Sequence, residues 1–280
     1  MAQPKDAWFE HIENPSGLLL ELAQAKTGAD IFTFWQTLPE TQPLYDYYFE
    51  WDNIAAIPIQ SYDYWFKKQV VQNARNKIRK ALKLGVIVEE VPFDDAFCMS
   101  LTKIYNETPI RQGRKFIHYG IDVEALKDGL SDKLESAVFL GAFYEGELVG
   151  YIKLLLLRKF IRATGTLTST RHRDKPIMNL LICKAVEYCA LHTFPFLAYG
   201  RFTYGKKGDD GLTEFKRHNG FEKIDIPRYY IPITLTGKLA LRLKLHREMS
   251  SLLPTNLYQF FLSLRSRWYT KSKAAFYSSK

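Results

Sequence analysis

The sequence predicts an α/β protein of the α+β kind, in which helices flank one mixed central sheet and extensions lie at both ends. Two apolar runs, 137–144 and 148–157, meet at Glu145-Gly146 as the strands of a hairpin do. A third run, 163–169, alternates like a strand, and apolar residues follow helical spacing from Pro176 onward. With 46% hydrophobic residues, the 280-residue chain can bury a substantial core.

The segments before the hairpin alternate between strand and helix patterns. Gly85 is expected to end a long helix and Asp94 to cap the next one. The predicted elements are a helix at 17–25, a strand at 31–35, paired strands at 44–51 and 54–59, helices at 65–84, 94–105 and 122–130, and a strand at 86–91.

After the hairpin we expect a strand at 196–199, a helix at 212–218 that Gly220 stops, and a last strand at 221–231. Leucines between 239 and 245 fit a strand or a helix, and both remain open. A later helical stripe consists of Leu257, Phe261, Leu264 and Trp268, beside basic residues. The chain thus divides into an N-terminal extension (1–60) packing on the core, a core (61–232) and a basic amphipathic tail (233–280).

The formal net charge of +9 favours an anionic partner such as a nucleotide cofactor, RNA or an acidic membrane, or else reflects a solvated basic surface. The predicted helix at 65–84 carries much of this charge. Three cysteines without disulfide or metal-ligand spacing predict a cytoplasmic protein and no metal. No signal peptide or membrane span is predicted. The tail either packs on the body or a second subunit, or makes peripheral contact with the inner face of the membrane.

The stretch 106–120 holds too many polar groups for a core element, so it is predicted to be a loop. An ordinary surface loop is one interpretation, and we favour a binding loop because arginines there suit bidentate contacts with phosphate or carboxylate. Glu107 or His118 could act as a general base, although a lone histidine is more often structural. The substrate-binding candidates are Arg111, Gln112, Arg114 and Tyr119.

The order of elements over about 85–231 resembles the GNAT (acyl-CoA N-acyltransferase) superfamily. The matching pieces are the hairpin around Leu148-Val-Gly150, the helix from Pro176, and the ending Phe215-Lys-Arg-His-Asn-Gly-Phe221. The resemblance implies that one strand splays from its neighbour and that acyl-CoA lies in the gap. It also implies that amides at the following helix start hold the pyrophosphate, and that an amide within 166–168 serves the oxyanion.

The predicted phosphate loop departs from the family pattern Gln/Arg-x-x-Gly-x-Gly/Ala. The segment Arg173-Asp-Lys-Pro-Ile-Met178 keeps the arginine and lacks both small residues, which in the family let the backbone approach the phosphates. Basic side chains beside the helix start would reinforce its positive field. The cofactor-binding candidates implied by the resemblance are Thr168, Arg171, Arg173, Lys175, Ile177 and Met178.

Two stretches are similar to the FemABX-like branch of this fold, which takes an aminoacyl-tRNA donor. They are the Arg79-Lys-Ala81 helix and Gly211-Leu-Thr-Glu-Phe-Lys216. In that branch the matching lysine stabilises developing negative charge, so the resemblance gives Lys216 this role; an exposed helix residue is the alternative. In GNAT enzymes a tyrosine often stands at this position to protonate the leaving group, and Tyr204 is an alternative acid here.

The resemblance therefore implies transfer of an acyl group from acyl-CoA, such as acetyl-CoA, to an amine or hydroxyl. The expected acceptor is a small molecule, with an anionic compound or a cell-envelope precursor among the options. One alternative is an aminoacyltransferase that uses aminoacyl-tRNA. The other is a catalytically silent module of the same fold that binds a nucleotide, RNA or a membrane.

Overall fold

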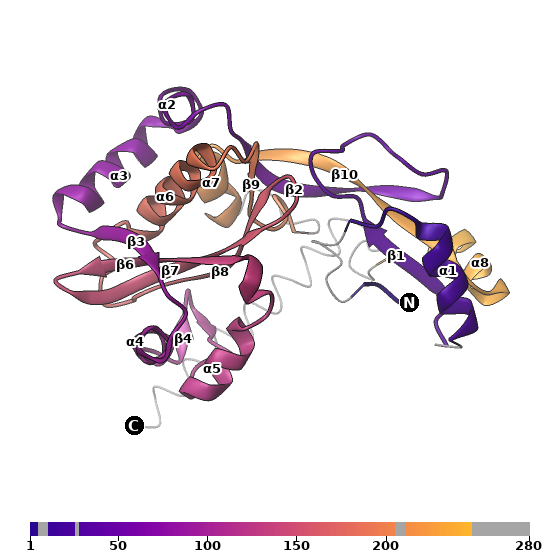
Figure 1. The fold of residues 1–280 in the computed structure, drawn as a ribbon, viewed down its shortest axis with the longest axis horizontal. Helices are drawn as coiled ribbons and strands as arrows, with labels where there is room; N and C mark the ends of the chain where they lie inside the picture. Colours follow the sequence, from indigo (N-terminus) through magenta and orange to yellow (C-terminus); the bar gives the residue numbers. More distant parts are fainter. Residues whose placement is uncertain (5–10, 26–27, 205–210, 248–280) are drawn as a thin grey trace.

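The computed structural model describes residues 1–4, 11–25, 28–204 and 211–247. Their strands form one large sheet in the order β1-β10-β2-β9-β8-β7-β6-β3, antiparallel at every junction except β8–β9 (Figure 1). The strands are β1 (Ile31–Trp35), β2 (Phe49–Pro58), β3 (Ile87–Val91), β6 (Ala137–Tyr144), β7 (Glu147–Leu156), β8 (Ile161–Thr168), β9 (Phe196–Ala198) and β10 (Glu222–Pro232).

Helices cover both faces of this sheet, so the predicted mixed α/β fold is confirmed. The helices α3 and α6 pack on one face, and α4 and α5 cover the other (Figure 1). Their bounds are α1 (Pro15–Gln24), α2 (Tyr62–Tyr64), α3 (Gln72–Lys83), α4 (Asp95–Tyr105), α5 (Val123–Leu130), α6 (Ile177–Leu191), α7 (Gly211–His218) and α8 (Leu235–Arg242). Asp94 caps α4 as predicted, accepting from the Phe97 amide at 2.8 Å.

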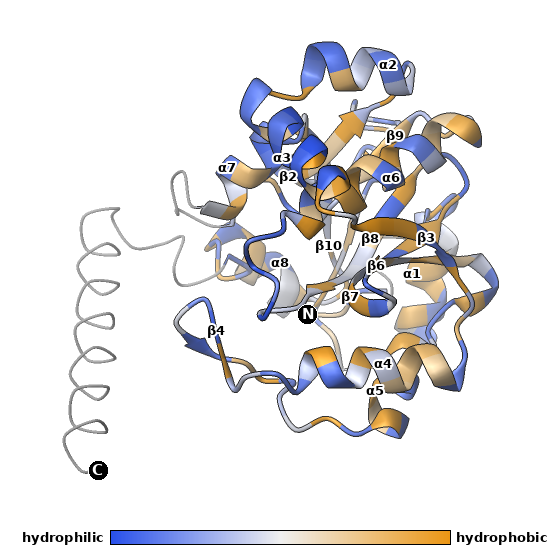
Figure 2. Ribbon diagram, turned by 90° about the vertical axis from the view of Figure 1, so that its left-hand side faces the viewer, coloured by the Kyte–Doolittle hydropathy of each residue, from blue (hydrophilic) through white to orange (hydrophobic). Residues whose placement is uncertain are grey.

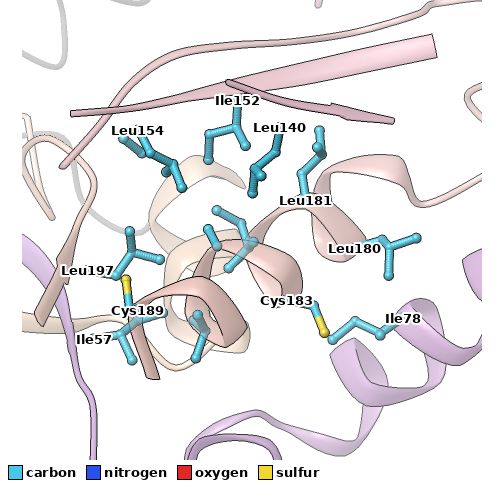
Figure 3. Packing of buried hydrophobic residues seen from close by; sticks show 14 of the residues in the cluster. Ile57, Ile78, Leu140, Ile152, Leu154, Leu180, Leu181, Cys183, Cys189 and Leu197 are labelled. Carbon is cyan, nitrogen blue, oxygen red and sulfur yellow. The ribbon is translucent and has the colours of Figure 1, made fainter. Parts of the chain in front are cut away.

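The helix α6 lies at the centre of the main core (Figure 3). It is apolar on almost every side because it packs between the sheet and α3. Figure 3 shows Leu181 facing Leu140 and Ile152 of the strands, while Cys183 lies beside Ile78 of α3. The Cys183 and Cys189 thiols are free and buried, in keeping with a packing role.

The predicted continuous helix at 65–84 is wrong, because the chain breaks at Val70 and Val71. A π-helical turn, Trp65–Gln69, ends there, and both valines adopt extended backbone angles before α3 begins. The Val71 amide donates instead to the His218 carbonyl at 3.1 Å. Arg75 satisfies the carbonyls of Phe66, Lys67 and Val70, so the break leaves few polar groups without partners.

The predicted pair of strands at 44–51 and 54–59 is one strand, β2, and residues 44–48 form a loop. The Leu44 and Tyr45 amides donate to the Tyr229 hydroxyl at 2.8 and 3.3 Å, which removes them from any ladder. Since β2 lies between β9 and β10, the predicted boundary at residue 60 cuts through the sheet. Residues 49–58 therefore pair with strands of the predicted core.

At the far end, β10 carries the sheet to a group made of β1, α1 and α8, seen on the right of Figure 1. Of the leucines left open between strand and helix, Leu239 and Leu241 lie in α8, Leu243 is its C-cap and Leu245 lies in the turn that follows. The predicted stripe from Leu257 to Trp268 lies outside the described residues. Within the described part of the chain, every helix is too short or too polar to cross a bilayer.

Candidate functional site

The strands β8 and β9 diverge, as the resemblance implies. They pair only at Ile161–Leu197 and Arg162–Ala198, after which β9 ends while β8 continues to Thr168. A cavity of about 1340 Å³ lies beyond this junction, between the end of β8 and the segment that follows β9. Its lining includes Thr166 to Thr168 on one side and Tyr199 and Tyr204 on the other. This volume exceeds the roughly 300–1,000 Å³ of a typical ligand pocket, so it has room for a donor and an acceptor together.

The end of β8 turns backbone amides toward this cavity. The Ser169 amide donates to the Val149 carbonyl of β7 at 2.8 Å. Successive amides of a strand point to opposite edges, so the amides of Thr168 and Thr166 face away from β7, on the cavity side. They are the donors best placed to meet an oxyanion, within the 166–168 segment that the resemblance indicates.

Arg111, predicted to bind substrate, uses its terminal nitrogens in hydrogen bonds to backbone carbonyls. Its side chain is 13% exposed, and its two terminal nitrogens donate to the Thr168 carbonyl at 2.8 Å and the Ile104 carbonyl at 2.5 Å. It therefore joins the end of α4 to the end of β8. Its Nε is buried without a partner among the described residues. The guanidinium carbon lies 4.8 Å from the centre of the Phe116 ring. This geometry makes Arg111 a positioning residue for the Thr168 backbone.

Glu107, predicted as a general base, has its carboxylate occupied in the same way. It accepts from the Ser169 hydroxyl at 2.6 Å and from the Thr170 amide and hydroxyl at 2.5 and 2.8 Å. Burial alone would raise the pKa of Glu107, but these hydrogen bonds and the charge of Arg111 lower it below its ordinary value. A carboxylate with a depressed pKa and three hydrogen-bond donors around it is a weak base. The geometry gives Glu107 a clamping role on the loop after β8.

That loop uses many of its amides internally. Besides Thr170, the Arg171 amide donates to the Ser169 hydroxyl and the Lys175 amide to the His172 carbonyl. The Ile177 amide donates to the Lys175 carbonyl at 2.8 Å, and no side chain of the described residues caps α6 at Pro176. The start of α6 is thus open, but the loop leading to it offers fewer amides for a pyrophosphate than the resemblance implies.

The six predicted cofactor-binding residues separate into two groups. Thr168, Arg173 and Met178 line the cavity. The Ile177 side chain is buried in the core instead, and Lys175 lies 4.3 Å from the Tyr144 ring and 3.1 Å from Asp174. Arg171 is exposed and lies outside the lining.

Lys216 is buried, so the alternative of an exposed helix residue is excluded. Only 1% of it is accessible, and its Nζ donates to the Arg201 carbonyl. The same ammonium lies 5.0 and 5.3 Å from the ring centres of Tyr199 and Tyr204. Since both tyrosines line the cavity, Lys216 lies behind its wall. The two rings separate this ammonium from the cavity.

Tyr199 and Tyr204 differ in exposure. The Tyr199 hydroxyl is 2.9 Å from the Thr166 hydroxyl, which links the two diverging strands across the gap. Burial raises the pKa of Tyr199, so its hydroxyl keeps its proton at neutral pH. Tyr204, the predicted acid, is more exposed and also faces the cavity.

The predicted binding loop contains a small hairpin, β4 (Ile110–Arg111) and β5 (Arg114–Lys115), visible at the left of Figure 2 with a hydrophilic tip. Gln112 and Gly113 form its turn with positive φ angles, as a tight hairpin requires. Gln112 and Arg114, predicted to bind substrate, line the cavity. His118 and Tyr119 are exposed and lie outside the lining.

Among the described lining residues, cations are frequent and carboxylates do not occur. The charged members are Arg111, Arg114 and Arg173. Such a wall suits an anionic group such as a phosphate or carboxylate. In the described part of the chain, His, Cys, Asp and Glu form no cluster suited to a metal ion.

No protein-family model and no curated protein sequence matches this chain. Solved structures do. The C-terminal domain of a putative lysylphosphatidylglycerol synthetase from Agrobacterium fabrum is similar over 81% of this chain and 75% of that one, with a TM-score of 0.54 and 12% identity. L-PGS from Bacillus licheniformis is similar over 80% of this chain and 75% of that one, with a TM-score of 0.51 and 19% identity. FemX is similar over 83% of this chain and 72% of that one, with a TM-score of 0.50 and 13% identity. The chain thus has a GNAT-like fold with FemABX-like structural relatives.

Sequence reasoning missed several residues of the site. Thr170 and Ser169 complete the Glu107 clamp, and Leu212 and Phe215 line the cavity. The run of hydroxyl residues at the end of β8 was a usable signal, because three of them precede a basic loop. The pairing of this run with a glutamate more than sixty positions earlier left no trace in local spacing.

Proposed function

We propose that the protein transfers an activated acyl group to an amine or hydroxyl acceptor in the cavity between the end of β8 and the segment that follows β9. The observation that carries this proposal is the divergence of the two strands beside the open start of α6. An acyl carbonyl placed there meets the Thr168 amide as oxyanion donor, with the Tyr199 and Tyr204 hydroxyls across the gap as proton donors. Lys216 adds positive charge behind the tyrosines as negative charge develops.

Within this proposal, aminoacyl-tRNA is the donor that the loop geometry favours over acyl-CoA. The amides of Thr170, Arg171, Lys175 and Ile177 already have protein acceptors, so a CoA pyrophosphate would find few free amides. The names of the similar structures, FemX and lysylphosphatidylglycerol synthetase, agree with aminoacyl transfer. The exposed basic face of α3, largely hydrophilic in Figure 2, offers phosphate contacts; its cations are Lys77, Arg79, Lys80 and Lys83.

A binding experiment separates the donors. The full chain is titrated with acetyl-CoA, uncharged tRNA and aminoacyl-tRNA at several salt concentrations. We expect tRNA affinity to fall steeply with salt, and K77Q/K80Q/K83Q to reduce that slope by about 2 to 3. Stabilisation by acetyl-CoA with salt-independent tRNA binding would instead favour acyl-CoA.

A matched pair of variants tests the cavity itself. Arg173 lines it and Arg171, two residues earlier on the same loop, does not. We expect R173Q to weaken donor binding about tenfold, the value of one charge-assisted contact, and R171Q to leave it unchanged. Equal effects of both variants would mean that the donor binds outside the cavity. Absence of transfer with either donor, despite binding, would favour a catalytically silent module.

A further inference from the structure

The helix α8 carries a row of leucines that are largely exposed. Leu235, Leu239 and Leu243 are 81%, 56% and 58% exposed, and Leu245 just beyond is 65% exposed. Residues four apart lie on one face of a helix, so the first three form a single row. A contiguous patch of exposed leucines is typical of an interaction surface, whereas single exposed leucines are common on any protein.

The opposite side of α8 is firmly attached to the body. Gly237 is buried, and a Cβ on it would lie 1.9 Å from the Asp30 carbonyl oxygen, so the helix backbone rests directly on the start of β1. Thr234 caps the helix by accepting from the Gly237 amide at 3.0 Å, and its hydroxyl donates to the Asp30 carboxylate at 2.5 Å. The leucine row is therefore held outward at a defined position and cannot rotate into the core.

The charges that the α8 segment itself carries have one sign, and the carboxylates that face it, Asp30 and Glu50, are bonded to Thr234 and to His246 and Arg247. From 233 to 247 the sequence contains no aspartate or glutamate. At 100° per residue, Lys238 and Arg242 lie along one edge of the leucine row, and Lys244 follows the helix. All three are exposed. Leucines bordered by cations are typical of a helix that lies in the interface of an anionic bilayer.

We propose that α8 docks the protein on an anionic lipid surface, with its leucines at the boundary of the acyl chains and its cations among the headgroups. A second copy of the chain fits less well, because a two-fold contact through this row would bring the Lys238 and Arg242 cations of the two copies together, and like charges repel. A single helix row also provides no groove for a partner helix, whereas a bilayer needs none. This inference is independent of the proposed reaction.

Vesicle co-sedimentation of the full chain tests the proposal. Wild-type protein should sediment with vesicles of phosphatidylcholine and phosphatidylglycerol, and weakly with phosphatidylcholine alone. L239S/L243S should reduce the binding about tenfold or more, because two leucines no longer enter the apolar layer. K238Q/R242Q should reduce binding about tenfold at low salt and only on anionic vesicles. Leu191→Ser is the matched control, since Leu191 is 76% exposed at the end of α6.

Thermal melting should be unchanged in all these variants, because the altered side chains are exposed. The proposal is overturned if L239S/L243S binds anionic vesicles as wild type does, which would assign the contact to another part of the chain. It is also overturned if wild-type protein ignores vesicles but forms a dimer in analytical ultracentrifugation that L239S/L243S abolishes.

Discussion

The two walls of the cavity are held by different kinds of interaction. On the β8 wall, Glu107 and Arg111 make directional hydrogen bonds to the backbone at Thr168 and Thr170. On the β9 wall, Lys216 lies against the faces of Tyr199 and Tyr204. Hydrogen bonds to a backbone determine where its amides point, whereas a buried ammonium behind aromatic rings supplies charge with little directional control. The β8 wall is thus fixed by directional bonds, and the β9 wall has a buried cation behind its aromatic rings.

The largest effect should come from removing the charge of the β9 wall. Lys216→Met keeps much of the volume and deletes the ammonium. We expect the single-turnover rate of acyl transfer to fall about 100-fold, as for loss of one electrostatic group at a transition state, while donor affinity changes little. A rapid-quench experiment with bound donor measures this rate. A melting curve shows whether the variant still folds, and a rate within twofold of wild type would remove the distinction between the walls.

The next effect concerns the geometry of the β8 wall. Arg111→Gln loses the bond to Ile104, to Thr168, or to both, because an amide cannot span the two carbonyls. We expect the free energy of unfolding to fall by about 3 kcal/mol, the order expected for buried hydrogen bonds from a charged group. Urea denaturation provides the measurement. Arg114→Gln on the same hairpin is the control, expected within about 0.5 kcal/mol of wild type because Arg114 is exposed.

Glu107→Gln tests the same wall by pH. The variant places an NH₂ group among hydrogen-bond donors, so we expect the free energy of unfolding at pH 7 to fall by about 2 kcal/mol. Hydrogen bonds hold the pKa of Glu107 below its ordinary value of 4.5 despite burial. The stabilisation is therefore complete above about pH 4.5 and is lost as the pH falls through the folded-state pKa. Stability curves of the two proteins should converge in acid, and a constant difference down to pH 3 contradicts the clamp.

The smallest effect should come from the bond that joins the two walls. Tyr199→Phe removes the hydroxyl that meets Thr166 across the gap at 2.9 Å. We expect the free energy of unfolding to fall by about 1 kcal/mol, a value typical of a neutral hydrogen bond. A double-mutant cycle with Thr166→Val isolates the pair, and additive effects of the two changes would show that the walls are not coupled through these hydroxyls.

Local patterns determined most of the elements. The hairpin at Glu145-Gly146, the cap at Asp94 and the helix after Pro176 were all evident, because turn chemistry, capping and helical periodicity act between residues close in the chain. Resemblance then correctly indicated the GNAT-like order of these elements.

Contacts between distant residues decided the rest. At the helix break, the Val71 amide bonds to the distant His218 carbonyl. The insertion of β2 between β9 and β10 depends on pairing across more than a hundred residues. Lys216 is buried and Lys175 is turned to Tyr144, although both are lysines in similarly polar surroundings in the sequence. Burial and hydrogen-bond partners are properties of the packed molecule. Residue type could therefore indicate candidates for the site, while only the tertiary structure shows which of them line the cavity, hold the backbone or pack in the core.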